Sequence, residues 1–293
     1  MSRRPISLEA VPPPALVLVG IASVQTGSAI ARTAFDVTGA AGMTLLRLLL
    51  AGALLTALVR PALRRWTRAQ WSAALTLGLT MGAMNLVFYE AIRTVPLGVA
   101  VTVEFIGPLL LAVAQTRRGR DLCWAVLAAA GVALLGLHDS GSVPVGGLAL
   151  ALLAGLCWAG YILSSARVGR VLPGLSGLAG ALLVGSVLAL PFGVAGAGRA
   201  VTDGWALLAG LGVALLSSVV PYACELTALR TMPTRVFGVL MSLEPAAAAV
   251  AGLLVLGQHL GLRELVALVL VSLASAGVTL GQRADRRAQP RHD

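Results

Sequence analysis

Long apolar runs follow one another along nearly the whole chain, and they constrain its fold more than any other feature. A run of about 18 or more apolar residues is long enough to cross a bilayer as a helix. Charged residues make up only 12% of the chain, about half the share that is usual in a soluble domain. A soluble helical bundle would need polar helix faces that this sequence lacks. We therefore expect an all-α membrane protein.

The chain divides into ten apolar segments, joined by short connections that often carry Gly, Pro or Arg. We predict transmembrane helices at roughly 15–33, 40–59, 71–90, 97–115, 122–138, 146–165, 175–197, 205–228, 236–257 and 263–281. Residues 1–14 and 282–293 are then two tails. Because five spans lie in each half of the chain, we expect two five-helix halves, residues 15–138 and residues 146–281.

The basic residues, all of them arginines, indicate how the chain lies in the membrane. One side of the ten predicted spans carries only Arg32, Arg93, Arg199 and Arg263, and Arg47 lies within a span. Every other arginine falls on the opposite side, together with both tails. Cytoplasmic loops carry the excess of positive charge in membrane proteins. We therefore predict cytoplasmic termini, and we interpret the net charge of +10 as a topology signal rather than a nucleic-acid surface.

Two segments of the chain are near copies of each other. AIRTVPLGVAVTVEFIGPLLLAV covers residues 91–113, and ALRTMPTRVFGVLMSLEPAAAAV covers residues 228–250, an offset of 137 residues. Each begins with Ala-x-Arg-Thr-x-Pro, and each has a second proline 12 residues after the first. Five predicted spans separate the copies, and because five is odd, the copies enter the membrane from opposite faces. Such an inverted repeat is typical of many secondary transporters, whereas chance similarity would not preserve both the motif and the proline spacing.

Each copy carries a glutamate shortly before its second proline. Glu104 and Glu244 lie about eight residues into their spans, which is roughly 12 Å deep for a helix in a hydrocarbon core about 30 Å thick. A charged carboxylate there costs about 2.5–3.5 kcal/mol, so it needs a partner, water or a proton. We expect both glutamates to line a central cavity, and at least one to couple proton uptake to substrate release. The alternative is that they only tie helices together by hydrogen bonds.

Three prolines interrupt predicted spans at a similar depth. A proline has no amide hydrogen, so the carbonyl group four residues earlier loses its helical partner. Pro108 frees the carbonyl of Glu104, Pro221 frees that of Ser217, and Pro245 acts in the same way in the ninth span. Unpaired backbone within a bilayer must face protein or a water-filled cavity. The prolines therefore predict a cavity beside the glutamates, although each could also be a packing kink.

Further polar residues lie within the spans. Arg47 could extend to the membrane surface, pair with a carboxylate of the protein, or hold a substrate carboxylate. Glu225 lies near the end of the eighth span, either at the interface or at the rim of a cavity. Two polar stripes recur at helical spacing: Gln25, Ser28 and Arg32, and Trp158, Tyr161 and Ser165. We expect the stripes to complete the cavity lining, with interfacial anchoring of Trp and Tyr as the alternative.

No motif indicates an enzyme or a bound cofactor. The sequence contains no His-Glu-x-x-His, no phosphate-binding P-loop and no Gly-x-Ser-x-Gly, which are patterns with known catalytic roles. The three cysteines lie apart within apolar runs, so neither a metal site nor a disulfide framework is indicated. We therefore expect no catalytic residue, no metal and no cofactor. Without an ATP-binding motif, active transport would depend on an ion gradient.

Four stretches of the chain carry a family resemblance: TLLRLLLAG, TVPLGVAVTVEFIGPL, CWAGYILSS and PTRVFGVLMSLEPAAAAVAG. They resemble the drug/metabolite transporter superfamily, and within it the EamA-type branch that includes the bacterial threonine and homoserine exporters. The likeness covers nearly the whole chain. It implies ten helices in two inverted repeats, a bacterial inner membrane, and efflux of small amino acids driven by the proton gradient. Matching positions are Glu104, Glu225, Glu244, Pro108 and Pro245, whereas Glu90 stands where such exporters usually have a small residue.

These features together predict a secondary exporter of small hydroxylated amino acids that works by alternating access and proton antiport. Glu104 or Glu244 would contact the substrate ammonium group, and Arg47, Gln25 and Asn85 would donate hydrogen bonds to its carboxylate. The expected partners are the small-molecule substrate, protons and the lipid bilayer, but not nucleic acid, and a homodimer is one assembly that the chain could form. Two alternatives are an exporter of another small cargo, such as a hydrophobic cation, and a non-transporting membrane scaffold or sensor.

Overall fold

The computed structural model describes residues 11–116, 122–136, 144–232 and 234–286, and the regular elements within these ranges are all helices. In chain order they are α1 (Pro13–Thr33), α2 (Phe35–Val59), η2 (Leu63–Arg65), α3 (Arg68–Thr94), α4 (Leu97–Glu104), α5 (Ile106–Thr116), α6 (Leu122–Gly136), α7 (Val145–Val171), α8 (Ser176–Thr202), α9 (Gly204–Ala214), η4 (Leu215–Val219), α10 (Val220–Thr231), α11 (Thr234–Met241), α12 (Glu244–Leu256) and α13 (Leu262–Arg286). Within the described residues, nine helical stretches are long and apolar enough to cross a membrane, and α6 is a shorter apolar helix. The prediction of an all-helical membrane protein is therefore confirmed.

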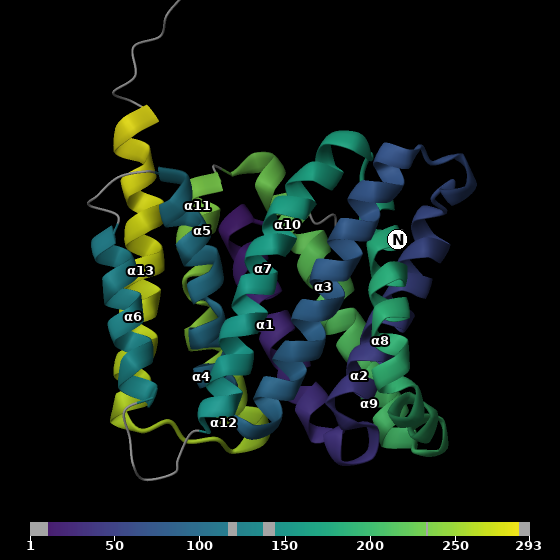
Figure 1. Cartoon of the computed structure of the whole chain (residues 1–293), viewed down its shortest axis with the longest axis horizontal. Coiled ribbons are helices and arrows are strands. Elements are labelled where there is room, and N and C mark those ends of the chain that lie inside the picture. The colour runs from purple at the N-terminus through teal and green to yellow at the C-terminus, as the bar shows by residue number, and fades with distance from the viewer. Residues whose placement is uncertain (1–10, 117–121, 137–143, 233, 287–293) are drawn as a thin grey trace, which may run out of the picture.

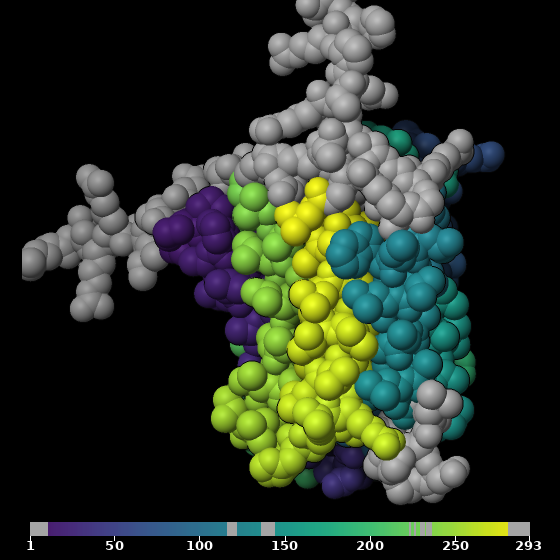
Figure 2. All heavy atoms as spheres, turned by 90° about the vertical axis from the view of Figure 1, so that its left-hand side faces the viewer, coloured from purple at the N-terminus to yellow at the C-terminus, as the bar shows by residue number. Residues whose placement is uncertain are grey.

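The helices run side by side in one bundle (Figure 1). α13 packs against α6 at one edge, and α8 packs against α2 and α3 at the opposite edge. The face seen in Figure 2 is formed by α6, α13, the α11–α12 segment and α1. The two broken helices, α4–α5 and α11–α12, lie between these edges (Figure 1).

The outer surface of the bundle is apolar. Large side chains such as Phe192 and Leu254 are 68% and 77% exposed, and many other leucines and valines face outward in the same way. A surface of this kind in water would be an unusually large apolar patch, whereas in a bilayer it faces lipid. The surface therefore agrees with the low charge content of the sequence.

Glycines bring α8 close to α2 and α3. A methyl group added at Gly42 of α2 would lie 2.9 Å from the Cα of Gly196. One added at Gly78 of α3 would lie 2.6 Å from the carbonyl oxygen of Ala181. Small residues allow helix backbones to approach closely where lipid removes the hydrophobic driving force. These contacts hold the α2–α3–α8 edge together without polar side chains.

Three helices are interrupted near the predicted prolines. α4 ends at Glu104, and α5 continues from Ile106; α11 ends at Met241, and α12 begins at Glu244. The third interruption is η4, a π-helical segment that ends two residues before Pro221. The backbone irregularities that the prolines predict are therefore present.

Several helices extend beyond their predicted apolar ends. α3 begins at Arg68 rather than residue 71, because Thr67 and Gln70 form a capping box in which each side chain bonds to the other residue's amide. α2 begins at Phe35 rather than residue 40 and is kinked at Gly39, whose φ of 65° suits a residue without a Cβ. Polar caps and kinks lie outside the apolar pattern, so hydropathy alone does not locate these ends.

Candidate functional site

A cavity of about 140 Å³ lies among the interrupted helices. Its lining includes most of the predicted site residues: Gln25, Arg47, Asn85, Glu104, Trp158, Tyr161, Pro221, Glu225 and Glu244. These residues come from α1, α2, α3, α4, α7, α10 and α12. Segments from both halves of the chain therefore meet at one cavity.

Two of the three cavity carboxyl groups stand at the ends of broken helices. Glu104 is the last residue of α4, and Glu244 is the first residue of α12; their exposed fractions are 7% and 6%. The third, Glu225, comes from α10 and lines the same cavity, which favours the cavity alternative for this residue. A helix carries partial negative charge at its C-terminal end and partial positive charge at its N-terminal end. Because α5 begins two residues after Glu104, its N-terminal end offsets the partial charge of α4 there, and the group that can attract a cation is the carboxyl group of Glu104 itself.

Arg47 does not extend to the membrane surface, which corrects one alternative for this residue. It is 7% exposed, and its Nη2 donates to the carbonyl oxygen of Ser217 at 2.8 Å. Longer contacts join its Nη1 to the hydroxyl of Tyr89 and its Nε to the hydroxyl of Ser218. The carbonyl that Pro221 frees thus receives a charged donor. No carboxylate among the described residues forms an ion pair with Arg47, so the alternative in which Arg47 pairs with a carboxylate is not borne out there.

Two neutral amides face the same cavity. The Nδ2 of Asn85 donates to the carbonyl oxygen of Met81 at 2.8 Å, one turn earlier in α3. Part of its donor capacity is therefore used within its own helix. Gln25 is 5% exposed, and its Oε1 is buried without a hydrogen-bond partner among the described residues.

Aromatic side chains separate this cavity from a second one of about 330 Å³. Trp158 and Tyr161 line both cavities, as does Glu225. The hydroxyl of Tyr161 donates to that of Tyr222 at 3.3 Å, and Trp158 packs edge-on against Phe105 with ring centroids 5.1 Å apart. Pro108 lines the second cavity. Beyond the central cavity, the bundle is thus hollow on the side of α5 and α11.

The opposite side of the central cavity is tightly packed. Val99 is 2% exposed, and a methyl group added at Gly98 of α4 would lie 2.9 Å from the Cα of Ala249 in α12. The Oε1 of Gln258 accepts a hydrogen bond from the backbone amide of Leu97 at 2.9 Å. The half-helices α4 and α12 therefore close this side of the cavity.

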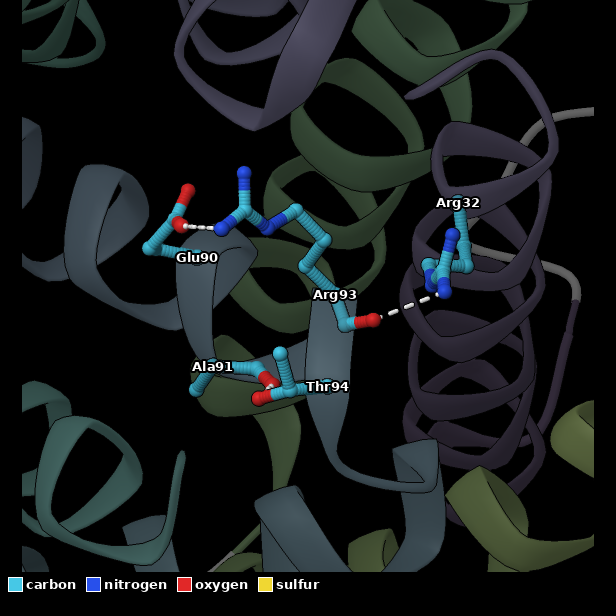
Figure 3. Close-up of polar contacts among 5 residues, drawn as sticks. All are labelled: Arg32, Glu90, Ala91, Arg93 and Thr94. Carbon is cyan, nitrogen blue, oxygen red and sulfur yellow. Dashed lines mark hydrogen bonds and ion pairs between the residues drawn. The ribbon is translucent and has the colours of Figure 1, made fainter. Parts of the chain in front are cut away.

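Arg32 departs from the predicted polar stripe. Gln25 and Ser28 line the cavity, but the guanidinium of Arg32 donates to the carbonyl oxygens of Ile92 and Arg93 at 2.8 and 2.7 Å. Figure 3 shows the bond from Arg32 to the carbonyl oxygen of Arg93, together with the ion pair in which the guanidinium of Arg93 lies 2.8 Å from the carboxylate of Glu90. Arg32 thus satisfies carbonyl groups at the end of α3 that no helical amide can reach, and it ties α1 to α3.

Some lining residues were not predicted, and some predicted residues do not line the cavity. Met84, Phe88, Val101 and Met241 contribute apolar lining, and their positions could not be distinguished from ordinary apolar helix positions in the sequence. Pro245 is buried beside Glu244 but belongs to neither cavity lining. Its position favours the alternative of a packing kink at this proline.

Comparisons with known proteins identify similar sequences along nearly the whole chain. Residues 145–280 match the family described as "EamA-like transporter family". The threonine/homoserine exporter RhtA of Escherichia coli (strain K12) is 43% identical over 277 residues, which cover 94% of each chain. The exporter of the same name from Salmonella typhimurium (strain SL1344) is 42% identical over 273 residues, or 92% of each chain. A solved crystal structure shares the fold, with a TM-score of 0.57, 20% identity, and coverage of 94% of this chain and 99% of that one.

Proposed function

Because this chain belongs to the EamA-like transporter family, we propose that it exports small hydroxylated amino acids, such as threonine or homoserine, across a bacterial inner membrane. The proposal extends to this chain the activity that its 43% identical relatives are named for. The central cavity supports it independently, since its size and its charges suit a small zwitterion.

The observation that carries the substrate class is the pairing of opposite charges around a small cavity. Drug-sized ligands occupy pockets of about 300–1,000 Å³, whereas this cavity measures about 140 Å³. Its lining contains the guanidinium of Arg47 and three carboxyl groups. A hydrophobic cation has no anionic group that could pair with the buried guanidinium of Arg47, whereas a free amino acid has a carboxylate.

The two charged groups of the substrate have separate partners in this proposal. Arg47 has five N–H donors, of which three are used by Ser217, Ser218 and Tyr89. The remaining two would bind the substrate carboxylate. The ammonium group would bind at Glu104, whose carboxyl group lines the same cavity as Arg47.

Charge balance supports coupling to protons. Three carboxyl groups and one guanidinium line the cavity, so full ionisation would leave a net charge of about −2 in a medium where each charge is costly. Protons on the carboxyl groups remove this cost in the empty cavity. An arriving ammonium group would displace a proton, and proton uptake from the other side of the membrane would in turn expel the substrate.

Alternating access would follow from two inverted five-helix halves, residues 15–138 and 146–281, with α6 as a tenth span. The first residues of the two repeated segments have matching local structure, which supports the inverted repeat. The Val95 amide donates to the Ala91 carbonyl at 3.0 Å, and the Met232 amide donates to the Ala228 carbonyl at 2.9 Å. In both copies an eight-residue half-helix follows, α4 or α11. Closure at α4 and α12 with a hollow at α5 and α11 would be one of the two alternating states.

Purified protein in proteoliposomes tests the proposed cargo. We expect radiolabelled threonine and homoserine to move through the protein when a pH gradient is imposed, and we expect cationic dyes not to move. A membrane scaffold or sensor would give no flux, and it would give no counterflow when unlabelled threonine is placed on the opposite side. The absence of both would remove the proposed function.

The carboxyl groups are tested in the same system. Glu104→Gln and Glu244→Gln keep the shape of each side chain but cannot exchange a proton. We expect at least one of them to abolish acceleration by the pH gradient while leaving energy-independent counterflow measurable. Glu90→Gln is the matched control, because Glu90 pairs with Arg93 away from the cavity. Wild-type acceleration in both cavity variants, across a range of gradients, would contradict proton coupling at these residues.

A further inference from the structure

We propose that the side-chain amide of Gln25 binds the hydroxyl group of the cargo and so selects hydroxylated amino acids over their deoxy analogues. This inference rests on the proposed function and assigns a residue to one part of the substrate. It concerns the group that distinguishes threonine and homoserine from other amino acids of similar size.

The starting observation is an unsatisfied polar atom on a residue that lines the cavity. Gln25 is 5% exposed, it lines the central cavity, and its Oε1 has no hydrogen-bond partner among the described residues. A buried polar atom that lacks a hydrogen-bond partner destabilises the folded protein. By contrast, the hydroxyl of Ser23, two residues earlier in α1, donates to the carbonyl oxygen of Leu216 at 2.7 Å. The Oε1 of Gln25 is therefore a buried acceptor for which the described residues supply no donor.

The chemistry of an amide matches that of a hydroxyl group. A hydroxyl both donates and accepts a hydrogen bond, and a glutamine amide carries an acceptor oxygen and a donor nitrogen that exchange places when the group turns over. The charged ends of the substrate have stronger partners in Arg47 and the carboxyl groups. The neutral amide is thus left for the one neutral polar group of the cargo.

The position of Gln25 also fits this assignment. It lies eight residues before the end of α1, and Glu104 lies seven residues after the start of α4. These two helix ends lie on the same face of the bundle, because Arg32 near the end of α1 bonds to the carbonyl groups that precede α4. At about 1.5 Å per residue, Gln25 and Glu104 lie at a similar depth. A substrate whose ammonium group is held at Glu104 would have its side chain at the level of Gln25.

The test compares threonine with 2-aminobutyrate, which is the deoxy analogue of both threonine and homoserine. Counterflow of both compounds is measured in proteoliposomes containing wild-type protein, Gln25→Met or Gln25→Leu. Both variants remove the amide, and methionine keeps nearly the same length. The readout is the ratio of the two rates within one preparation, so it does not depend on how much of a variant is folded. Gln115→Met is the matched control, because Gln115 is exposed at the end of α5 and outside the cavity.

We expect wild-type protein and Gln115→Met to prefer threonine, since a site built to bond a hydroxyl discriminates strongly against analogues that lack it. We expect Gln25→Met and Gln25→Leu to reduce that preference by about tenfold or more, which corresponds to the loss of one buried hydrogen bond. An unchanged ratio in both variants, or a wild-type protein that does not distinguish the two compounds, would overturn the inference while leaving amino-acid export intact. Absence of flux for any amino acid in wild-type protein would instead remove the proposed function, and this inference with it.

Discussion

At the scale of single residues, two arginines, Arg47 and Arg93, differ in what surrounds them. Arg47 is buried and bonds to the carbonyl oxygen of Ser217 at 2.8 Å, whereas Arg93 is exposed and pairs with Glu90, also partly exposed. Hydrogen bonds to a charged group are worth about 1.5–3 kcal/mol, while exposed ion pairs contribute about 0–1 kcal/mol. The same substitution should therefore have different effects at the two positions.

We predict that Arg47→Met lowers the free energy of unfolding in detergent by about 1.5–3 kcal/mol, because the Ser217 carbonyl freed by Pro221 loses its donor. Arg93→Met is the control and should lower it by less than about 1 kcal/mol. Thermal unfolding of the two purified variants measures the difference. Equal losses would mean that the Arg47 contact contributes nothing beyond a surface pair.

At the scale of elements, close packing between helices depends on positions where no side chain fits. Gly196 and Gly198 both lie in α8, but a methyl group at Gly196 would collide with the carbonyl oxygen of Thr38 in α2, whereas one at Gly198 would meet nothing within 4 Å. The two glycines therefore offer a matched pair within a single helix.

We predict that Gly196→Ala destabilises the protein by about 1–3 kcal/mol, because α8 must move away from α2 to accommodate the methyl group. Gly198→Ala should be neutral or stabilising by up to about 1 kcal/mol, because alanine favours the helical conformation more than glycine does. Unfolding of both variants in detergent tests this, and a stable Gly196→Ala protein would show that the α2–α8 contact is looser than the structure has it.

At the scale of the whole molecule, the loops at the two ends of the bundle differ in their arginine content. Arg64 lies in the connection between α2 and α3, and His259 lies in the connection between α12 and α13; these connections are at opposite ends of the bundle (Figure 1), and both side chains are exposed. The positive-inside rule assigns the arginine-rich face to the cytoplasm.

We predict that Arg64→Cys reacts with a membrane-impermeant maleimide only in inverted vesicles, and His259→Cys only in right-side-out vesicles. The background for both is a variant in which Cys123, Cys157 and Cys224 are replaced by serine. The reverse pattern would place the termini outside, and reaction of both residues from one side would exclude the predicted number of spans between them.

Much of the fold could be predicted from the sequence because the rules involved are local. Apolar runs specify helices in lipid whatever surrounds them, so the helical class follows from the apolar runs alone. A proline removes an amide hydrogen whatever its neighbours are, so the helix breaks near Pro108, Pro221 and Pro245 follow from residues a few positions apart. The meeting of Glu104 and Glu244 at one cavity followed from counting residues along helices, whereas the place of Arg47 was left open.

Only the tertiary structure decided which groups meet across helices. The sequence treats Gln25 and Arg32 as one polar stripe, but Arg32 bonds to carbonyl groups of α3, whereas the Oε1 of Gln25 has no partner in the part of the chain that the structure describes. Phe88 likewise lines the cavity, and the periodicity of the sequence does not reveal this position. Hydropathy and backbone chemistry are properties of neighbouring residues, whereas a hydrogen-bond partner or a cavity wall is supplied by segments far apart in the chain, and only packing brings them together.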